Sequence, residues 1–207
     1  MSRDHAVDTR TLELPPPVEP LGSVRELLEL ILAGTDVAES EVEGGAAAEC
    51  VDQLAHALQC AHVAARLAPQ DEELQIAALV HDIGHLVHPG YDRTHGLVAA
   101  ELVRPLLGDR VADLAALHVP AKRYLVSAES AYSGRLSEVS TITLQNQGGP
   151  MSEEEQEAFR SLPDFGAALL LRRADEAAKV PGRAVPTLAA WVSALDRLAR
   201  RAGGEDV

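Results

Sequence analysis

The chain has 207 residues, of which 46% are hydrophobic and only 3% aromatic, and its formal net charge is −14. An acidic surface of this kind repels polyanions, so the composition argues against a protein that binds nucleic acid or acidic membranes. Abundant Ala and Leu favour helices over strands, and the length suits one domain with a substantial core. We therefore expect an all-α fold.

Two further features concern where the protein works. No stretch approaches the roughly 20 apolar residues of a membrane span, and residues 1–20 lack the apolar core of a secretory signal. Cys50 and Cys60 form neither a zinc pattern nor a disulfide framework, so both are expected to be reduced. These features predict a cytoplasmic protein without a membrane partner, and they leave its oligomeric state open.

The chain begins with a proline-rich segment. Residues 1–20 carry four prolines near their end, and a helix cannot continue through them, so we expect a flexible or extended leader outside the core. Residues 21–203 are expected to form a single helical domain. Within it, residues 24–33 repeat apolar side chains at helical spacing, and Gly34 is placed to end that helix.

The next elements are also helical. A long helix is predicted over residues 46–67, after a pair of glycines. Asp71 can cap a further helix over residues 72–80, because a carboxylate at that position accepts hydrogen bonds from the first turn. A loop that could help to form a site is expected at residues 84–90.

The second half of the chain contains a basic pair close to a histidine. Residues 119–124 are expected to form a short connector with two cations, since Pro120 should end the preceding helix. A cation so soon after a histidine, in an acidic protein, suggests an anionic substrate group, with a solvated basic pair as the alternative. Ser152 and Glu155 predict a capping box. Four further helices are predicted, over residues 94–107, 110–118, 169–178 and 186–201.

The most informative residues are the adjacent pair His81-Asp82, which closes an apolar helix where packing would favour aliphatic side chains. Two polar residues that end an apolar run need partners when they are buried. A carboxylate next to a ligating histidine can bridge two ions, since Asp82 points about 100° around the helix from His81 and offers two oxygens. The pair therefore predicts a metal site.

Other candidate ligands lie at spacings that let several helices assemble one site: His56, His95, His118 and Asp175. Imidazoles and carboxylates together suit Fe, Mn or Zn better than Mg or Ca. Six candidate ligands are too many for one tetrahedral zinc, which favours two ions. His5 and His62 are interpreted as ordinary surface or core residues, and His88 is left open.

The order His56, His81-Asp82, His118 and Asp175 is typical of the HD-domain superfamily, helical metalloproteins that are mostly phosphohydrolases. Four local runs resemble more narrowly the HD-domain mixed-valence diiron oxygenases of the PhnZ and TmpB type, which oxidatively cleave carbon–phosphorus bonds in 1-hydroxyphosphonates. These runs are residues 53–61, 81–85, 118–125 and 147–152. The resemblance covers roughly residues 46–180.

The resemblance implies a helical bundle around a dinuclear iron site, with O2 as co-substrate at an Fe(II)/Fe(III) pair and with phosphate and a carboxylic acid as products. Asp82 would bridge the two irons. The iron ligands would be His56, His81, Asp82, His95, His118 and Asp175, and the catalytic residues His81, Asp82, His95 and His118. The organophosphonate would be held by a cation together with hydroxyl, amide and imidazole groups: His85, Lys122, Ser140, Thr143 and Gln147.

The chain departs from the family pattern in the segment before the first histidine, which typically reads Tyr-x-x-Glu. The matching positions here are Ala46 and Glu49. The resemblance implies that Glu49 contacts a substrate amine, as in 2-amino-1-hydroxyethylphosphonate, while Ala46 replaces a gating tyrosine. Without the resemblance, the segment that contains Ser140, Thr143 and Gln147 reads as an ordinary polar loop.

Other functions could use the same ligands. An HD-domain metal-dependent phosphohydrolase would activate water at paired divalent ions against a phosphate ester or nucleotide. A sensor or partner-binding module would hold the metal without an open coordination position. His85 favours the oxygenase over cyclic-dinucleotide phosphodiesterases, which usually carry Lys there. Lys122, together with the segment at residues 147–149, favours a phosphonate over the polyol of inositol oxygenase.

Overall fold

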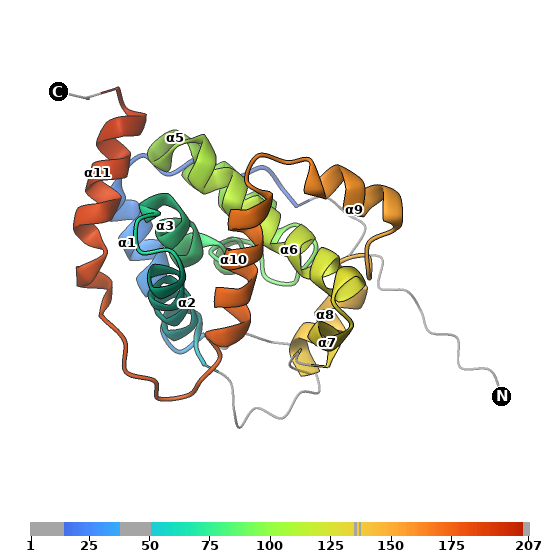
Figure 1. Ribbon diagram of the computed structural model, residues 1–207. Coiled ribbons are helices and arrows are strands. Elements are labelled where there is room, and N and C mark those ends of the chain that lie inside the picture. The colour runs from blue at the N-terminus through green and yellow to red at the C-terminus, as the bar shows by residue number, and fades with distance from the viewer. Residues whose placement is uncertain (1–14, 38–50, 135, 137, 205–207) are drawn as a thin grey trace.

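The computed structural model describes residues 15–37, 51–134, 136 and 138–204, and the regular elements of these residues are helices (Figure 1). The expected all-α fold is therefore confirmed. Within the described residues, no helix has both the length and the apolar character needed to cross a membrane.

Four helices surround the centre of the molecule: α2 (Gln53–Leu67), α3 (Glu72–Val80), α6 (Asp109–Ala128) and α10 (Phe165–Ala177). Helix α10 packs against α2, α3 and α6, and α5 (His95–Leu107) lies along the first half of α6. The buried side chains between these helices are mainly aliphatic, among them Leu74, Leu114 and Leu171. Their burial removes apolar surface from water and is the main favourable contribution to folding.

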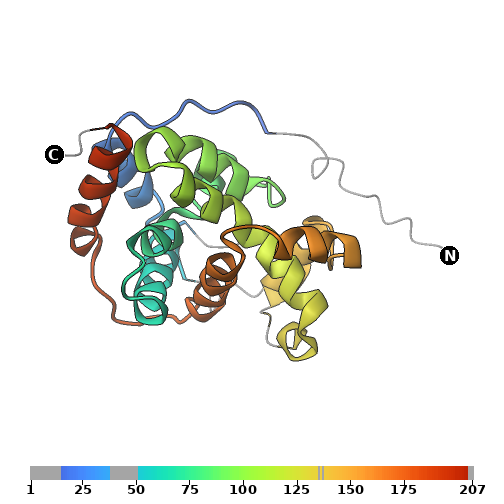
Figure 2. The ribbon, with the colours of Figure 1, turned by 45° about the horizontal axis from the view of Figure 1, so that its top comes forward.

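The remaining helices cover this centre. Helix α11 (Val192–Ala202) packs on α1, α3 and α5, after a short 3-10 turn η2 (Leu188–Ala190), and α1 (Val24–Leu32) contacts α2 and α11. Figure 2 shows α6 running past this bundle to a second group of short helices at its far end. That group contains α7 (Ser130–Ser133), α8 (Glu138–Asn146) and α9 (Glu153–Arg160).

Several predicted helix ends are confirmed by their caps. The Asp71 side chain accepts a hydrogen bond from the backbone N–H of Leu74, and α3 follows as expected. Ser152 and Glu155 form the predicted capping box. The long second helix begins later than predicted, because Asp52 caps it at Gln53; residues 46–50 lie outside the described part of the chain.

Two segments for which no helix was predicted are helical. Helix α6 continues through Pro120 to Ala128, so the expected connector at residues 119–124 is wrong. Proline inside a helix removes one hydrogen bond and costs about 3 kcal/mol in isolation, but burial of Ala121 and Leu125 favours continuing this helix. Residues 140–147, which read as an ordinary polar loop only without the family resemblance, lie largely in helix α8.

The described end of the leader lies against the domain. Residues 15–23 form no helix, as the prolines require, yet Val18 packs against the hydrophobic core. The partly buried His88 ring donates a hydrogen bond from Nε2 to the carbonyl oxygen of Pro16 at 3.0 Å. An extended segment can thus bury an apolar side chain, which the prediction of a leader outside the core did not anticipate. The division into leader and domain remains a prediction.

Candidate metal centre

Four histidines and two aspartates from five parts of the chain meet at the centre of the molecule. His81 and Asp82 directly follow α3, and His95 is the first residue of α5. The other three ligand candidates lie inside helices: His56 in α2, His118 in α6 and Asp175 in α10. His118 is therefore not at a helix end, as the sequence suggested, but in the middle of a long helix.

Each of these histidines uses Nδ1 to donate a hydrogen bond to a backbone carbonyl oxygen. The acceptors are Ala178 for His56 at 3.2 Å, Ala78 for His81 at 2.9 Å, Asp92 for His95 at 2.7 Å, and Ala115 for His118 at 2.6 Å. A neutral imidazole that donates from Nδ1 presents a lone pair at Nε2. The backbone therefore selects the tautomer in which all these rings can bind metal through Nε2.

The Asp82 carboxylate lies between two pairs of histidines. Its Oδ2 atom is 3.5 Å from His56 Nε2 and 3.3 Å from His81 Nε2. Its Oδ1 atom is 3.2 Å from His95 Nε2 and 3.4 Å from His118 Nε2. One oxygen thus faces each pair, which is the arrangement that a bridging carboxylate requires.

Asp175 belongs to one of these halves. Its Oδ1 atom lies 3.4 Å from His56 Nε2, and its Oδ2 atom lies 3.9 Å from His81 Nε2. The half formed by His56 and His81 therefore has a carboxylate of its own in addition to Asp82. The half formed by His95 and His118 shows no such second carboxylate among the described residues.

Two features of the centre are better explained by bound metal ions than by hydrogen bonds within the protein. His81 Nε2 is buried and has no hydrogen-bond partner among the described residues. His95 Nε2 and His118 Nε2 lie 2.7 Å apart although both rings already donate from Nδ1. A hydrogen bond between them would need an imidazolium, whereas burial, together with His95 and His81, lowers the pKa of His118 well below its usual range. The donor set fits a metal on each side of Asp82.

Both carboxylates are ionised in this environment. Burial by itself raises the pKa of Asp175, but the Arg172 and Lys179 charges and the His56 contact hold that pKa well below its usual range. The pKa of Asp82 is likewise lowered despite burial, by its histidine neighbours. Ionised carboxylates and neutral imidazoles are the protonation states that bind metal ions.

Two glycines allow the helices to come this close. A Cβ atom added to Gly84 would lie 2.1 Å from the carbonyl oxygen of His95, so α4 (Gly84–Val87) could not approach α5. A Cβ atom at Gly96 would lie 2.8 Å from Cε1 of His118. Glycine at these positions is therefore a requirement of the centre.

The predicted phosphonate residues lie next to the metal candidates. Buried Lys122 is one helical turn after His118, and its Nζ donates to Thr143 Oγ1 at 2.7 Å. Gln147 Nε2 donates at 3.1 Å to the carbonyl oxygen of Asp92, which also accepts from His95. Lys122, which was predicted to lie in a connector, is thus a buried residue of helix α6. The alternative prediction of a solvated basic pair is therefore wrong for this lysine.

Two other predicted substrate residues can be placed, and one cannot. The His85 ring stacks on the ring of His95 with centroids 3.9 Å apart, and Asp82, His85 and His95 also lie close enough to share an ion. Ser140 is buried beside the Arg172 guanidinium, with Oγ 3.4 Å from Nη2. Glu49, like Ala46, lies outside the described residues.

Sequence reasoning missed two polar residues that hold the centre in place. Buried Arg172 contacts both Asp175 and Ser140. Buried Gln59 exchanges two hydrogen bonds with the backbone of Val180, at 2.9 and 3.2 Å, and so ties α2 to the segment after α10. Both residues lie three positions from a ligand candidate. Because residues at that spacing share a helix face, the sequence could have indicated that they lie beside the metal centre.

The fold and the site together define a class of protein: a helical protein with a buried His and Asp centre suited to two metal ions. Residues 54–201 of the chain match the HD domain family. A hydroxymethylphosphonate dioxygenase of Gimesia maris is 41% identical over 149 residues, which cover 68% of this chain and 74% of that protein.

Two other proteins are also similar to this chain. A glycine-betaine-forming [1-hydroxy-2-(trimethylamino)ethyl]phosphonate dioxygenase of Leisingera caerulea is 37% identical over 63% of this chain and 70% of its own length. An uncharacterized protein, L432, of Acanthamoeba polyphaga mimivirus is 34% identical over 68% of both chains. The chain belongs to the HD-domain family, and within it to the HD-domain oxygenases that the sequence resemblance predicted.

Proposed function

We propose that this enzyme uses O2 to cleave the carbon–phosphorus bond of a 1-hydroxyphosphonate at a mixed-valence Fe(II)/Fe(III) site. The observation that carries the proposal is the position of Asp82, with one carboxylate oxygen toward each of two histidine pairs. The buried cation at Lys122, one turn from His118, adds a group suited to a phosphonate. The two relatives named as phosphonate dioxygenases support the same reaction class.

In this proposal the two ions have unequal ligand sets. One would be held by His56, His81, Asp175 and Asp82, and the other by His95, His118 and Asp82. The second set has fewer protein ligands, so an external ligand can bind there. When bound, the irons supply the electron transfer to O2 that side chains cannot provide.

The anionic group of the substrate would be bound by side chains of the protein. Lys122, Ser140, Thr143, Gln147 and His85 would bind and orient the phosphonate, so that its C1 atom faces the metal centre. Burial, followed by the charge of Arg172, lowers the pKa of Lys122 to about 7. An arriving phosphonate would favour the protonated lysine, and the desolvated pocket would strengthen that ion pair.

The proposal also concerns the substituent on the substrate carbon that carries the hydroxyl group. We infer a substrate like 2-amino-1-hydroxyethylphosphonate, with Glu49 as partner of the amine. The named relatives act on hydroxymethylphosphonate and on a trimethylamino analogue, so the three compounds form a graded test. For hydroxymethylphosphonate the atoms balance: HOCH2PO3H2 and O2 give HCOOH and H3PO4.

The test is an assay of iron-loaded enzyme with each of the three hydroxyphosphonates, with and without O2. We expect equal amounts of phosphate and carboxylic acid from at least one of them, and only when O2 is present. Lys122→Ala should keep the metals and weaken substrate binding. Release of phosphate from a phosphate ester without O2, with no reaction of any hydroxyphosphonate, would instead identify the metal-dependent phosphohydrolase.

A further inference from the structure

Arg172 is a buried cation that connects the metal centre to the proposed phosphonate pocket. Its Nη1 donates to Asp175 Oδ2, and its Nη2 donates to Glu176. The remaining contacts run to Tyr132, where Nε donates to the hydroxyl at 2.8 Å, and to Ser140 Oγ at 3.4 Å. One guanidinium thus joins α7, α8 and α10 around a ligand candidate.

These contacts fix how Asp175 presents its oxygens. Because Oδ2 accepts from Arg172, Oδ1 is the oxygen that faces His56 Nε2, at 3.4 Å. A carboxylate that is buried without such a donor could rotate or take up a proton, and either change would remove a negative ligand from the centre. The planar fork of a guanidinium suits this role because it holds two acceptors at fixed angles.

The contact is made on one side of the centre. Asp175 lies with His56 and His81, while the hydrogen-bond partners of His95 and His118 outside the centre are the backbone carbonyls of Asp92 and Ala115. Within the described residues, no arginine is hydrogen-bonded to that second pair. A change at Arg172 should therefore affect the two metal positions unequally.

We propose that Arg172 is the positioning residue that holds Asp175 as a ligand of one metal position and so makes the two positions unequal. The inference rests on the proposed two-metal function and concerns which half of the centre is rigid. The half with Asp175 is held by the guanidinium, and the half with His95 and His118 is left to accept an external ligand. Through Ser140 the same guanidinium also reaches the proposed anion pocket.

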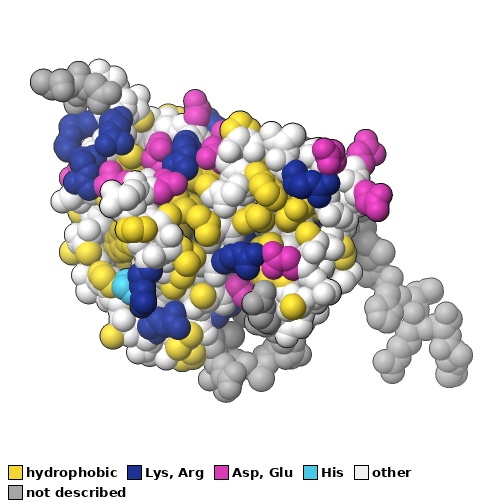
Figure 3. Space-filling model, viewed as in Figure 1, with side chains coloured by type: hydrophobic (Ala, Val, Ile, Leu, Met, Phe, Trp, Pro, Cys, Tyr) yellow, Lys and Arg dark blue, Asp and Glu magenta, His cyan; other side chains and the backbone are white. Residues whose placement is uncertain are grey.

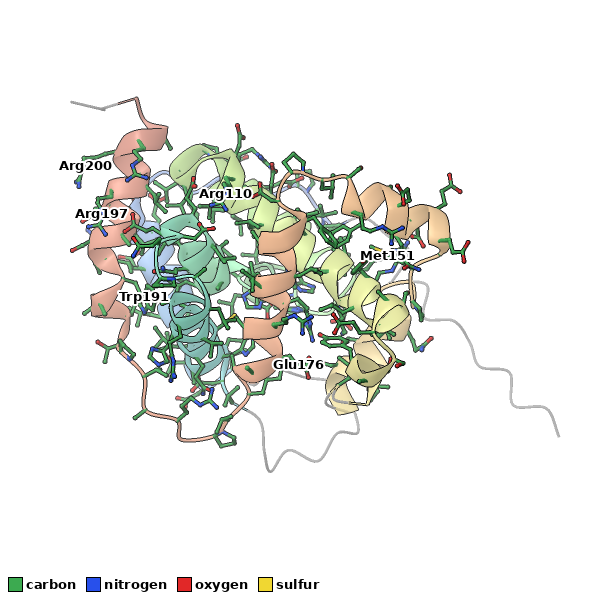
Figure 4. The ribbon with its side chains drawn as sticks, viewed as in Figure 1. Arg110, Met151, Glu176, Trp191, Arg197 and Arg200 are labelled. Carbon is green, nitrogen blue, oxygen red and sulfur yellow. The ribbon has the colours of Figure 1, made fainter. Side chains whose placement is uncertain are left out.

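Arg110 provides a matched control, because it too is an arginine that holds several carboxylates. It contacts Asp71, Glu73 and Asp164 at 2.7 to 3.0 Å, away from the metal centre. Figure 4 shows Arg110 and Glu176 near opposite ends of α10. Arg110→Gln should thus report the general cost of losing a partly buried arginine network.

The experiment is a titration of metal-depleted full-length protein with Co(II), followed by its visible absorption, for wild type, Arg172→Gln and Arg110→Gln. Wild type should bind two ions. In Arg172→Gln one of the two affinities should fall about tenfold or more while the other is unchanged, as expected for loss of a partner behind a ligand. Arg110→Gln should lower the thermal midpoint and leave both affinities unchanged.

Each alternative result has a defined meaning. A wild type that binds a single Co(II), or an Arg172→Gln variant with both affinities unchanged, overturns the inference. If Arg172→Gln does not fold, Tyr132→Phe decides, because it keeps the arginine and removes the contact at Nε: weakening of one site supports the role, and no weakening overturns it. If no hydroxyphosphonate reacted in the assay, the proposed function would be rejected, but the result of this metal titration would not change.

Discussion

At the scale of single residues, the bridging position of Asp82 makes a specific prediction about metal content. Asp82→Ala should lose both ions, since each oxygen faces one histidine pair, whereas Asp175→Ala should lose one. The metal content of anaerobically prepared variants measures this directly. Equal losses in the two variants would show that Asp82 does not join the two halves.

Lys122 gives a prediction about pH. Its pKa is about 7 in the folded protein, compared with 10.5 for an ordinary lysine, because burial disfavours the charge. Between these values Lys122 binds more protons in the unfolded chain than in the folded one, so its contribution to stability rises with pH across that window. Lys122→Met should therefore be more stable than wild type at pH 6, and its advantage should shrink as pH rises from 7 toward 10.

The measurement is chemical denaturation of both proteins across that pH range, with the same metal loading. The difference should change by on the order of 1 kcal/mol for each pH unit inside the window. Lys122→Arg serves as the control, because arginine stays charged throughout and cannot produce the upward trend. A constant difference between Lys122→Met and wild type would contradict a lowered lysine pKa.

The histidines and aspartates of the centre could be predicted because their chemistry shows in the sequence: His81-Asp82 interrupts an apolar helix, and the remaining candidates fall at the family spacing. The way in which these residues group around the two oxygens of Asp82 could not be predicted from the sequence. Which histidines share an oxygen of Asp82 depends on how α2, α5 and α6 pack, and no local pattern specifies that. Arg172 was missed because a positive residue in a helix is usually solvent-exposed.

At the scale of elements, the contact between α4 and α5 depends on Gly84. A methyl group there would lie 2.1 Å from the carbonyl oxygen of His95, which is backbone and cannot move independently. Gly84→Ala should therefore lower stability by several kcal/mol and disturb the metal half that contains His95. Thermal unfolding together with metal content would measure both effects.

Gly166, near the start of α10, is the matched glycine control. A Cβ atom there meets no heavy atom within 4 Å. Gly166→Ala should be neutral or stabilise the protein by up to about 1 kcal/mol, because alanine favours a helix. If Gly84→Ala behaved like Gly166→Ala, close packing of α4 on α5 would not be a requirement of the centre.

The wrong connector at residues 119–124 and the helix that was not predicted at residues 140–147 have one physical reason. Proline and hydroxyl residues disfavour helices locally, and sequence reasoning has access only to that local preference. In α6 and α8 the buried side chains of Leu125 and Leu144 supply tertiary packing that favours the helix. The capped ends at Asp71 and Ser152 were predictable because their hydrogen bonds are local.

At the scale of the whole molecule, charge and metal content should be linked to stability. Figure 3 shows basic side chains gathered over α11 and acidic ones over α9, with both signs mixed over the rest of this face. The buried centre is different: it concentrates two carboxylates and several imidazole lone pairs at one point. Metal ions would relieve the repulsion among these groups and satisfy their lone pairs.

Removal of metal should therefore destabilise the entire fold, because the ligand candidates come from helices across the bundle. We expect a chelator to lower the thermal midpoint and re-addition of Fe(II) to restore it, as binding to the folded state requires. Calorimetry of the metal-depleted and reloaded protein would measure the shift. An unchanged midpoint would mean that the centre contributes little binding energy to folding.

The most direct test of the central claim is low-temperature EPR combined with metal analysis of anaerobically purified, partly oxidised protein, before and after addition of hydroxyphosphonates. If Asp82 joins two irons, the protein should contain two irons per chain and give a mixed-valence signal that shifts when one of these compounds is added. Two redox-inactive divalent ions, or iron whose signal does not respond to any hydroxyphosphonate, would contradict it.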